Sequence, residues 1–246
     1  GVIIDGIAEY WSSSRKACLR LITNKETFNH LENEVPKAFT KLRPWINQGW
    51  EMVLLAQEIC NPESSLNNLG TEIYSKNYHL YQRKALEEYG WSPIDLQRAL
   101  EKTRQEQISK NFHYWLSTHK PFPEMVKKLQ NLEKEGFTFA VLTTKGYEFT
   151  QKLLQSLNLQ PSFVFGHEAG SKFEVLKKLS KENEIAGFIE DRRETLEKVV
   201  KILGPDLVPC FLASWGYLKP EDKKNLPTSI KLIETKDLTA PLASWI

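Results

Sequence analysis

Short apolar segments alternate with helical segments from Pro121-Phe122-Pro123 onward, and this alternation constrains the fold more than any other feature of the sequence. Strands that alternate with helices are joined by right-handed crossovers and form a mainly parallel sheet. The expected strands are residues 137–142, 163–165, 186–189, 208–212 and 230–233, and the expected helices are 123–135, 147–157, 172–183 and 195–203. We therefore predict an α/β fold with a doubly wound core.

Before this region the pattern is helical, because apolar and aromatic residues recur at helical spacing and strand signals are weak. The expected helices are 9–21, 26–39, 45–59, 71–89, which stops at Gly90, and a helix that begins after Ser92 and runs to residue 110. Val2-Ile3-Ile4 precedes them as the end of a strand, and Asp5-Gly6 gives a turn signal. The predicted organisation is a core of residues 1–7 and 121–246, with an all-helical domain of residues 8–120 inserted after the first strand.

Bulk composition excludes several classes of partner. The chain has 33 basic and 31 acidic residues, so its net charge of +2 gives no field that would favour nucleic acid or a membrane surface. Cys18, Cys60 and Cys210 are odd in number and far apart, which indicates neither a disulfide framework nor a zinc site. No apolar run is long enough to span a bilayer. We expect a cytoplasmic protein with no nucleic-acid or membrane partner, and the sequence does not indicate its oligomeric state.

Polar residues follow three of the predicted strands. Thr143-Thr144-Lys145 follows the first of them, Lys172 opens the helix after the next, and Glu190-Asp191 ends the third. The carboxyl ends of parallel strands share one edge of a sheet, where α/β proteins bind ligands. Phosphoryl transfer requires hydroxyl and amide donors for phosphate oxygens, a fixed positive charge and carboxylates for a metal ion. These residue types in this order indicate such a site.

Each residue also has a simpler interpretation. Glu190-Asp191 is typical of an acidic helix start, with Asp191 as N-cap and Glu194 in the first turn. An isolated threonine pair or lysine is usually solvated surface. His113 and His119 do not have the spacing of a one-face metal pair, so we interpret them as surface or packing residues. The sequence lacks GxGxxG, GxxxxGK[ST] and GxSxG motifs, and residues 166–172 match a phosphate-binding loop only loosely.

In the order of these motifs the chain resembles the haloacid dehalogenase superfamily of hydrolases. The family's first strand ends in Asp-x-Asp-Gly and continues with residues much like Val2-Ile3-Ile4-Asp5-Gly6. Val141-Leu142-Thr143 resembles its second motif, and Thr144-Lys145 stands where relatives often carry Asn-Lys. The third motif is similar to Lys172, the fourth to Glu190-Asp191, and a recurrent loop to Trp215-Gly216-Tyr217.

The resemblance implies a three-layer Rossmann-like core, a helical cap that closes over the substrate, and a Mg²⁺-dependent phosphatase that acts on a small phosphorylated metabolite through an aspartyl-phosphate. It implies catalytic roles for Thr143 and Lys172, with Thr143 and the amide of Thr144 binding the phosphoryl group. Asp191 and Glu190 are the implied metal ligands. Further phosphate or substrate contacts are expected from Thr144, Lys145, Asp5 and Arg43.

The sequence departs from the family pattern at two places. Thr195 stands where many members have a second acid, so Glu190 must supply any extra carboxylate. Neighbouring strand residues point to opposite faces, so both acids can reach one ion only where the strand has turned into a loop, and Asp191 is the better candidate. The nucleophile and general acid/base of Asp-x-Asp-Gly would precede Gly1. We therefore expect residues 1–246 to belong to a longer protein and to be inactive by themselves.

Two alternatives remain at the level of sequence. A member of the family without catalytic activity would keep the fold and act in binding or regulation. A haloacid dehalogenase needs no metal carboxylates, and Glu190-Asp191 argues against it.

Overall fold

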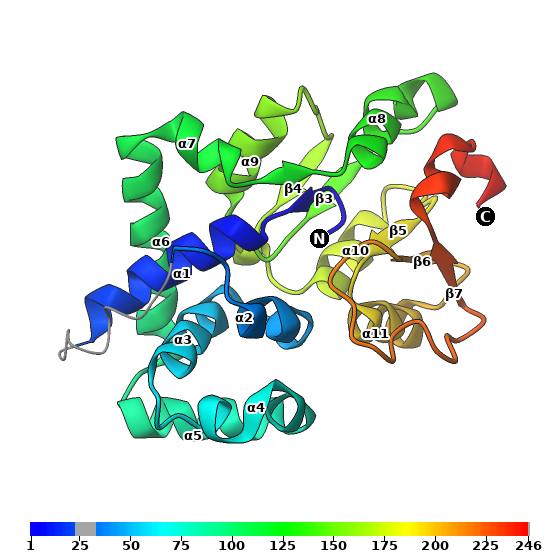
Figure 1. The fold of residues 1–246 in the computed structure, drawn as a ribbon. Helices are drawn as coiled ribbons and strands as arrows, with labels where there is room; N and C mark the ends of the chain where they lie inside the picture. The colour runs from blue at the N-terminus through cyan, green and yellow to red at the C-terminus, as the bar shows by residue number, and fades with distance from the viewer. Residues whose placement is uncertain (23–32, 246) are drawn as a thin grey trace. The chain divides into compact units, whose positions relative to one another are not determined.

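The computed structural model describes residues 1–22 and 33–245. In it the strands lie in one part of the chain, and the helices that precede Lys120 lie in another. The chain divides into one unit of Gly1–Asp5 and Lys120–Ile246 and a second unit of Gly6–His119 (Figure 1). Every strand of the described residues lies in the first unit, and the second unit is helical. Half of the helix predicted over residues 26–39 falls outside the described residues, and in its described half residues 37–39 are helical.

The described residues of the α/β unit form three small sheets. Strand β1 (Ile4–Asp5) pairs antiparallel with β2 (Lys120–Pro121). Strand β3 (Ala140–Leu142) pairs parallel with β4 (Phe163–Phe165), so that Val141 lies opposite Val164. Strand β6 (Cys210–Ala213) lies between β5 (Phe188–Glu190) and β7 (Ile230–Ile233) and is parallel to both. The predicted α/β class and the parallel pairing are confirmed.

The parallel strands do not form the single sheet that the sequence pattern predicts. Within the described residues β3 pairs only with β4, and β5 pairs only with β6, so no ladder joins the two groups. Strand β5 is also shorter at its start than predicted. A Cβ on Gly187 would lie 2.6 Å from the Phe211 ring, and the absent side chain lets the backbone approach that ring closely.

Buried side chains cover both faces of the sheet formed by β5, β6 and β7. Phe211 packs in one apolar cluster with Met125, Leu129 and Trp245, whereas its neighbours on β6 pack in another. That second cluster contains Cys210, Leu212, Leu196 and Val199. Successive strand residues point to opposite faces, so this alternation shows that β6 is covered on both sides.

In the described part of this unit four α-helices follow or precede the strands, and local sequence signals explain the starts of two of them. They are α8 (Pro123–Asn131), α9 (Tyr147–Ser156), α10 (Lys172–Leu179) and α11 (Arg193–Leu203). Pro123 occupies the first turn of α8, where its missing N–H costs no helical hydrogen bond. Helix α10 begins with a capping box in which the side chains of Ser171 and Glu174 satisfy backbone N–H groups. The capping box fixes Lys172 as the first residue of the helix.

The helical unit contains seven α-helices among its described residues: α1 (Ile7–Leu21), α2 (Lys37–Leu42), α3 (Gly49–Cys60), α4 (Ser65–Lys76), α5 (Tyr78–Tyr89), α6 (Pro93–Lys110) and α7 (Phe112–Ser117). The predicted helix 71–89 is interrupted at Asn77. Helix α4 begins at Ser65, where the Ser64 side chain accepts from the Asn67 N–H, and its backbone is non-helical at Gly70 (φ 76°), directly before the predicted start. Gly90 ends α5 with a φ of 64°, as predicted. No described helix has both the length and the apolar character needed to cross a membrane.

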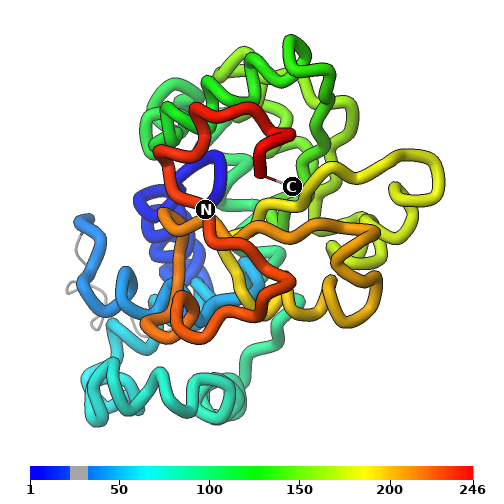
Figure 2. Tube along the Cα trace, turned by 90° about the vertical axis from the view of Figure 1, so that its right-hand side faces the viewer, coloured from blue at the N-terminus to red at the C-terminus, as the bar shows by residue number. Residues whose placement is uncertain are grey.

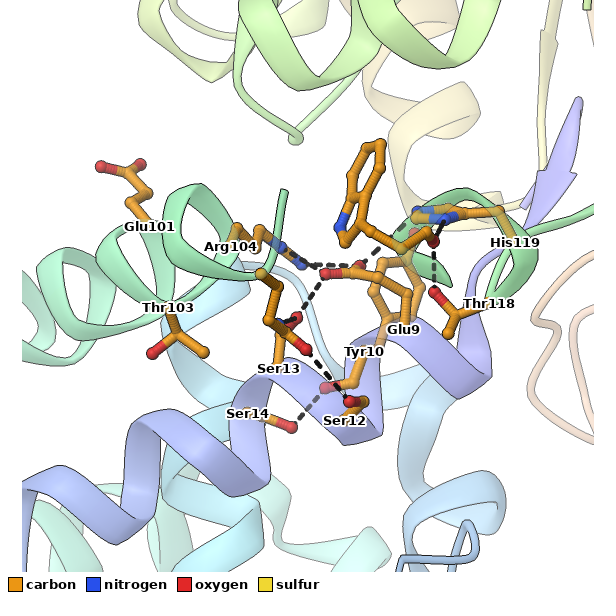
Figure 3. Close-up of polar contacts among 12 residues, drawn as sticks. Glu9, Tyr10, Ser12, Ser13, Ser14, Glu101, Thr103, Arg104, Thr118 and His119 are labelled. Atoms are coloured by element: carbon orange, nitrogen blue, oxygen red, sulfur yellow. Dashed lines mark hydrogen bonds and ion pairs between the residues drawn. The ribbon is translucent and has the colours of Figure 1, made fainter. Parts of the chain in front are cut away.

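A buried ion pair joins α1 to α6 inside the helical unit (Figure 3). Arg104 Nε donates to Glu9 Oε1 at 2.7 Å and its Nη2 donates to Oε2 at 3.1 Å. The Ser13 hydroxyl donates to Oε1 at 2.6 Å. His119 is buried as well, with Nε2 3.8 Å from Glu9 Oε2 and its ring 4.6 Å from the Trp115 ring centroid. His119 is therefore a packing residue.

Candidate active site

A lysine and a glutamate pair where β5 ends and α10 begins. Glu190 is the last residue of β5 and is 3% exposed, and Lys172 Nζ donates a hydrogen bond to its Oε2. The capping box places Lys172 at the helix start, with its side chain directed toward the strand end. The predicted meeting of Lys172 with Glu190 is therefore present as an ion pair that is largely shielded from water.

Burial dominates the electrostatics of Glu190. Desolvation raises the pKa of this carboxyl because the charged form loses water. The ammonium of Lys172 lowers the pKa, and the neighbouring Asp191 carboxyl raises it further. Two carboxyl groups and one lysine therefore lie close together with little access to water. A cation bound there would stabilise the ionised form of both carboxylates.

Asp191 lies one residue beyond the strand and is 5% exposed. Its Oδ2 accepts a hydrogen bond of 3.0 Å from the backbone N–H of Tyr217, and the nitrogen of Gly1 is 3.4 Å from the same oxygen. Helix α11 begins later than the N-cap interpretation requires, because its N-cap is Arg192 and no side chain caps it. The assignment of Asp191 as a helix N-cap is therefore wrong. Its carboxylate instead accepts a hydrogen bond from the loop after the neighbouring strand.

The residues after β3 form a turn of their own. Thr143 N donates to the Phe165 carbonyl at 2.9 Å, and Thr143 Oγ1 accepts from Lys145 N at 3.1 Å. Thr144 is exposed, and the Lys145 carbonyl accepts from His167 N at 3.3 Å. Because β3 belongs to a different sheet from β5, the convergence of these residues on Lys172 and the acids stays a prediction.

The other predicted substrate contacts lie in different settings. Asp5 on β1 accepts a hydrogen bond of 2.5 Å from the Tyr217 hydroxyl. Arg43 belongs to the helical unit, where its Nη1 donates to the Ile46 carbonyl at 3.2 Å and its guanidinium lies 4.9 Å from the centroid of the Tyr10 ring. A substrate role for either residue stays a prediction.

The loop after β6 contributes site residues to which sequence reasoning gave no role. Trp215 Nε1 donates to the Val2 carbonyl at 3.0 Å, and the N-terminal end of the chain lies beside this loop (Figure 2). A Cβ on Gly216 would lie 2.1 Å from Asp191 Cβ, so the loop packs directly on the acid. Tyr217 bonds both Asp191 and Asp5. Its position after the next parallel strand was the available signal, since that strand ends at the same edge.

The donor set suits a magnesium ion with few protein ligands. The described residues contain no group of three or more His, Cys, Asp or Glu side chains that could hold a metal ion. Mg²⁺ is usually bound through one or two carboxylates and otherwise by water and phosphate oxygens. Asp191 meets that need as a buried carboxylate held by a backbone amide, whereas Glu190 is already paired with Lys172.

Sequence comparison relates the chain to known proteins. The sequence profile of the haloacid dehalogenase-like hydrolases matches residues 51–192, which include Thr143, Lys172, Glu190 and Asp191. A phosphoglycolate phosphatase of Aquifex aeolicus (strain VF5) is 34% identical over 110 residues, which are 41% of this chain and 50% of the relative. The match thus spans about half the length of that relative. Since the profile covers more than half of the sequence, the chain belongs to the haloacid dehalogenase-like hydrolases.

Proposed function

We propose that this protein is a Mg²⁺-dependent phosphatase of a small phosphorylated metabolite, acting through an aspartyl-phosphate. The observation that carries the proposal is the pairing of half-buried Lys172 with buried Glu190, beside buried Asp191, at the end of β5 in a member of this hydrolase family. The name of the Aquifex relative makes 2-phosphoglycolate the first substrate to test.

Each residue has a role that its surroundings support. Thr143 would donate its hydroxyl, and Thr144 its backbone N–H, to oxygens of the phosphoryl group. Lys172 would stabilise the negative charge that develops on those oxygens, and Glu190 would hold the ammonium in place. Asp191, with Glu190 as a second carboxylate, would hold Mg²⁺, whose charge when bound stabilises the phosphoryl oxygens.

The helical unit has a proposed role as well. We assign Gly6–His119 as a cap that selects the substrate, with Arg43 as its candidate contact for a negatively charged group. A guanidinium group can donate two parallel hydrogen bonds to a carboxylate or a phosphate, and this suits the recognition of a small acidic metabolite.

The test uses the full-length protein, 2-phosphoglycolate, a panel of other phosphorylated metabolites and an aryl phosphate. Phosphate release is expected to require Mg²⁺ and to stop when EDTA is added. Asp191→Asn is expected to lower kcat/KM by about 100-fold, because loss of a ligand charge weakens stabilisation of the transition state. Asp206→Asn is the matched control, since Asp206 is an exposed acid of the same unit.

The outcomes separate the alternatives. Full activity of Asp191→Asn would reject its assignment as the metal ligand. A full-length protein that binds phosphorylated metabolites without turnover would instead be a binding or regulatory member of the family. Chloride release from a haloacid without added metal would indicate a dehalogenase.

A further inference from the structure

The loop after β6 contacts Asp191, the proposed metal ligand, through a hydrogen bond from Tyr217 that is independent of the pairing of β5. We propose that Tyr217 is a positioning residue for Asp191, and that its hydrogen bond to Asp5 sets how tightly the site binds a divalent cation. This inference rests on the proposed function, because it concerns the residue that would hold the metal ion.

Tyr217 makes two hydrogen bonds at opposite ends of the residue. Its backbone N–H donates to Asp191 Oδ2 at 3.0 Å, which fixes one oxygen of that carboxylate. Its hydroxyl donates to Asp5 Oδ1 at 2.5 Å, which ties the ring to β1. The backbone amide can therefore move away from Asp191 only if the bond to Asp5 breaks or the side chain turns.

The loop after β6 packs closely against Asp191. Gly216 precedes Tyr217, and a Cβ there would lie 2.1 Å from Asp191 Cβ and 2.8 Å from its Oδ2. Trp215, one residue earlier, is held through its Nε1 by the Val2 carbonyl at 3.0 Å. The loop thus lies against Asp191 with room only for a glycine, and hydrogen bonds to residues 2 and 5 hold it on both sides of that contact.

The far end of the same loop is fixed as well. Arg193 Nη1 donates to the Lys224 carbonyl at 2.6 Å and Nη2 donates to the Asn225 carbonyl at 3.1 Å. Asp222 Oδ2 accepts from Lys219 N at 2.8 Å. The backbone next to Tyr217 is held as well, since Gly216 N donates to the Ala213 carbonyl at 3.3 Å and Leu218 N donates to the Gly216 carbonyl at 3.1 Å, and the Tyr217 hydroxyl adds the tie to Asp5. Groups that orient a metal ligand commonly change metal affinity when they are removed.

The experiment removes only the hydroxyl. Tyr217→Phe keeps the ring and the backbone N–H, so a residue that merely fills space would tolerate it. Mg²⁺ binding to the full-length protein is measured by titration calorimetry, and activity is measured against Mg²⁺ concentration. We expect the dissociation constant for Mg²⁺ to rise about 10-fold. At saturating Mg²⁺ the activity should largely recover, and the urea midpoint should change little.

Tyr147→Phe is the matched control. Tyr147 lies on α9 of the same unit, is 45% exposed, and its hydroxyl accepts a hydrogen bond of 2.6 Å from Gln151 Nε2. Removing this surface hydroxyl should leave the affinity for Mg²⁺ unchanged. Asp5→Ala removes the acceptor of the Tyr217 hydroxyl and should weaken Mg²⁺ binding too. In the Asp5→Ala background, Tyr217→Phe should add little.

The results distinguish this inference from the proposed function. If the wild-type protein binds Mg²⁺ and releases phosphate but a folded Tyr217→Phe variant binds Mg²⁺ equally well, the positioning role is wrong and the proposed function stands. If Tyr217→Phe does not fold, Asp5→Ala decides in the same way. A wild-type protein that neither binds Mg²⁺ nor releases phosphate overturns both.

Discussion

Replacing Arg104 with methionine tests the buried ion pair of the helical unit. The guanidinium makes two hydrogen bonds to Glu9, and the side chains of the two residues are 4% and 1% exposed. Burial alone would lower the pKa of Arg104, but Glu9 outweighs it, so the guanidinium pKa is raised and the pair stays ionised. The substitution therefore leaves a carboxylate in the protein interior without its cation.

The magnitude follows from what remains around Glu9. Breaking a buried pair by removing one partner typically costs about 3–5 kcal/mol. The Ser13 hydroxyl at 2.6 Å and the His119 ring nitrogen at 3.8 Å still face the carboxylate. We therefore expect the lower end, about 3 kcal/mol, which is a large part of a typical stability of about 5–15 kcal/mol.

The assay is urea unfolding followed by tryptophan fluorescence. With a slope of about 2 kcal/mol per molar urea, a loss of about 3 kcal/mol lowers the midpoint by about 1.5 M. Arg98→Met is the matched control on the same helix, because Arg98 is 76% exposed and 3.7 Å from Asp95. Its effect should stay within about 0.5 kcal/mol.

A double variant separates a buried charge from a lost contact. Glu9→Gln with Arg104→Met removes both charges at once, and it should be less destabilised than Arg104→Met alone. If Arg104→Met shifts the midpoint no more than Arg98→Met does, or if the double variant is worse than the single one, the reasoning about an uncompensated charge fails.

Two further predictions concern buried ionisable groups. Lys128→Met should destabilise the α/β unit by about 1.5–3 kcal/mol, because buried Lys128 donates to Glu135 at 2.7 Å and to the Ala240 carbonyl at 2.7 Å; an unchanged urea midpoint would contradict this. Burial raises the pKa of Glu58 above its ordinary value of 4.5. The stability that the protonated Glu58 contributes is therefore fully present below pH 4.5, and it is lost as the pH rises through the pKa of the folded state. Glu58→Gln should therefore be more stable than wild type at pH 7, and this gain should shrink toward pH 4.5; a gain that does not depend on pH would refute it.

The sequence was most informative where the local signal was strong. Residues 163–165 and 230–233 form strands at the predicted positions. Helix α6 spans the predicted residues because Ser92 caps it and Pro93 occupies its first turn. The alternation of β6 residues between two clusters shows why the apolar runs lack a polar face, since both faces of that sheet are covered.

The sequence misled where the outcome depends on partners distant in the chain. The break at Asn77 between α4 and α5 leaves no glycine or proline as a marker, so periodicity alone joined the two helices. Whether neighbouring apolar runs pair into one sheet depends on what lies between them in space, and residue patterns do not specify this. Asp191 looked like an N-cap because its actual donor, the backbone N–H of Tyr217, is 26 residues away.

The same distance explains how much of the candidate site could be predicted. Lys172 and Glu190 carry opposite charges and follow successive strands, so their pairing could be inferred from side-chain chemistry. The contribution of Tyr217 to Asp191 is a backbone amide, and every residue except proline has one. Its role becomes visible only when the fold brings the loop after β6 against the end of β5.

Different surroundings give the two adjacent acids different tasks in the proposed reaction. The charge of Glu190 is balanced by Lys172, so its lone pairs are directed first to holding that ammonium where phosphoryl oxygens would lie. Asp191 is instead oriented by the backbone N–H of Tyr217, and the positive charge next to it is the amino group of Gly1, 3.4 Å from its Oδ2. Because the pairing with Lys172 is the closer of the two, Glu190 would attract Mg²⁺ less than Asp191 and would be its second ligand. In the proposed site, the Glu190-Asp191 pair would therefore hold a lysine and a metal ion side by side at one strand end.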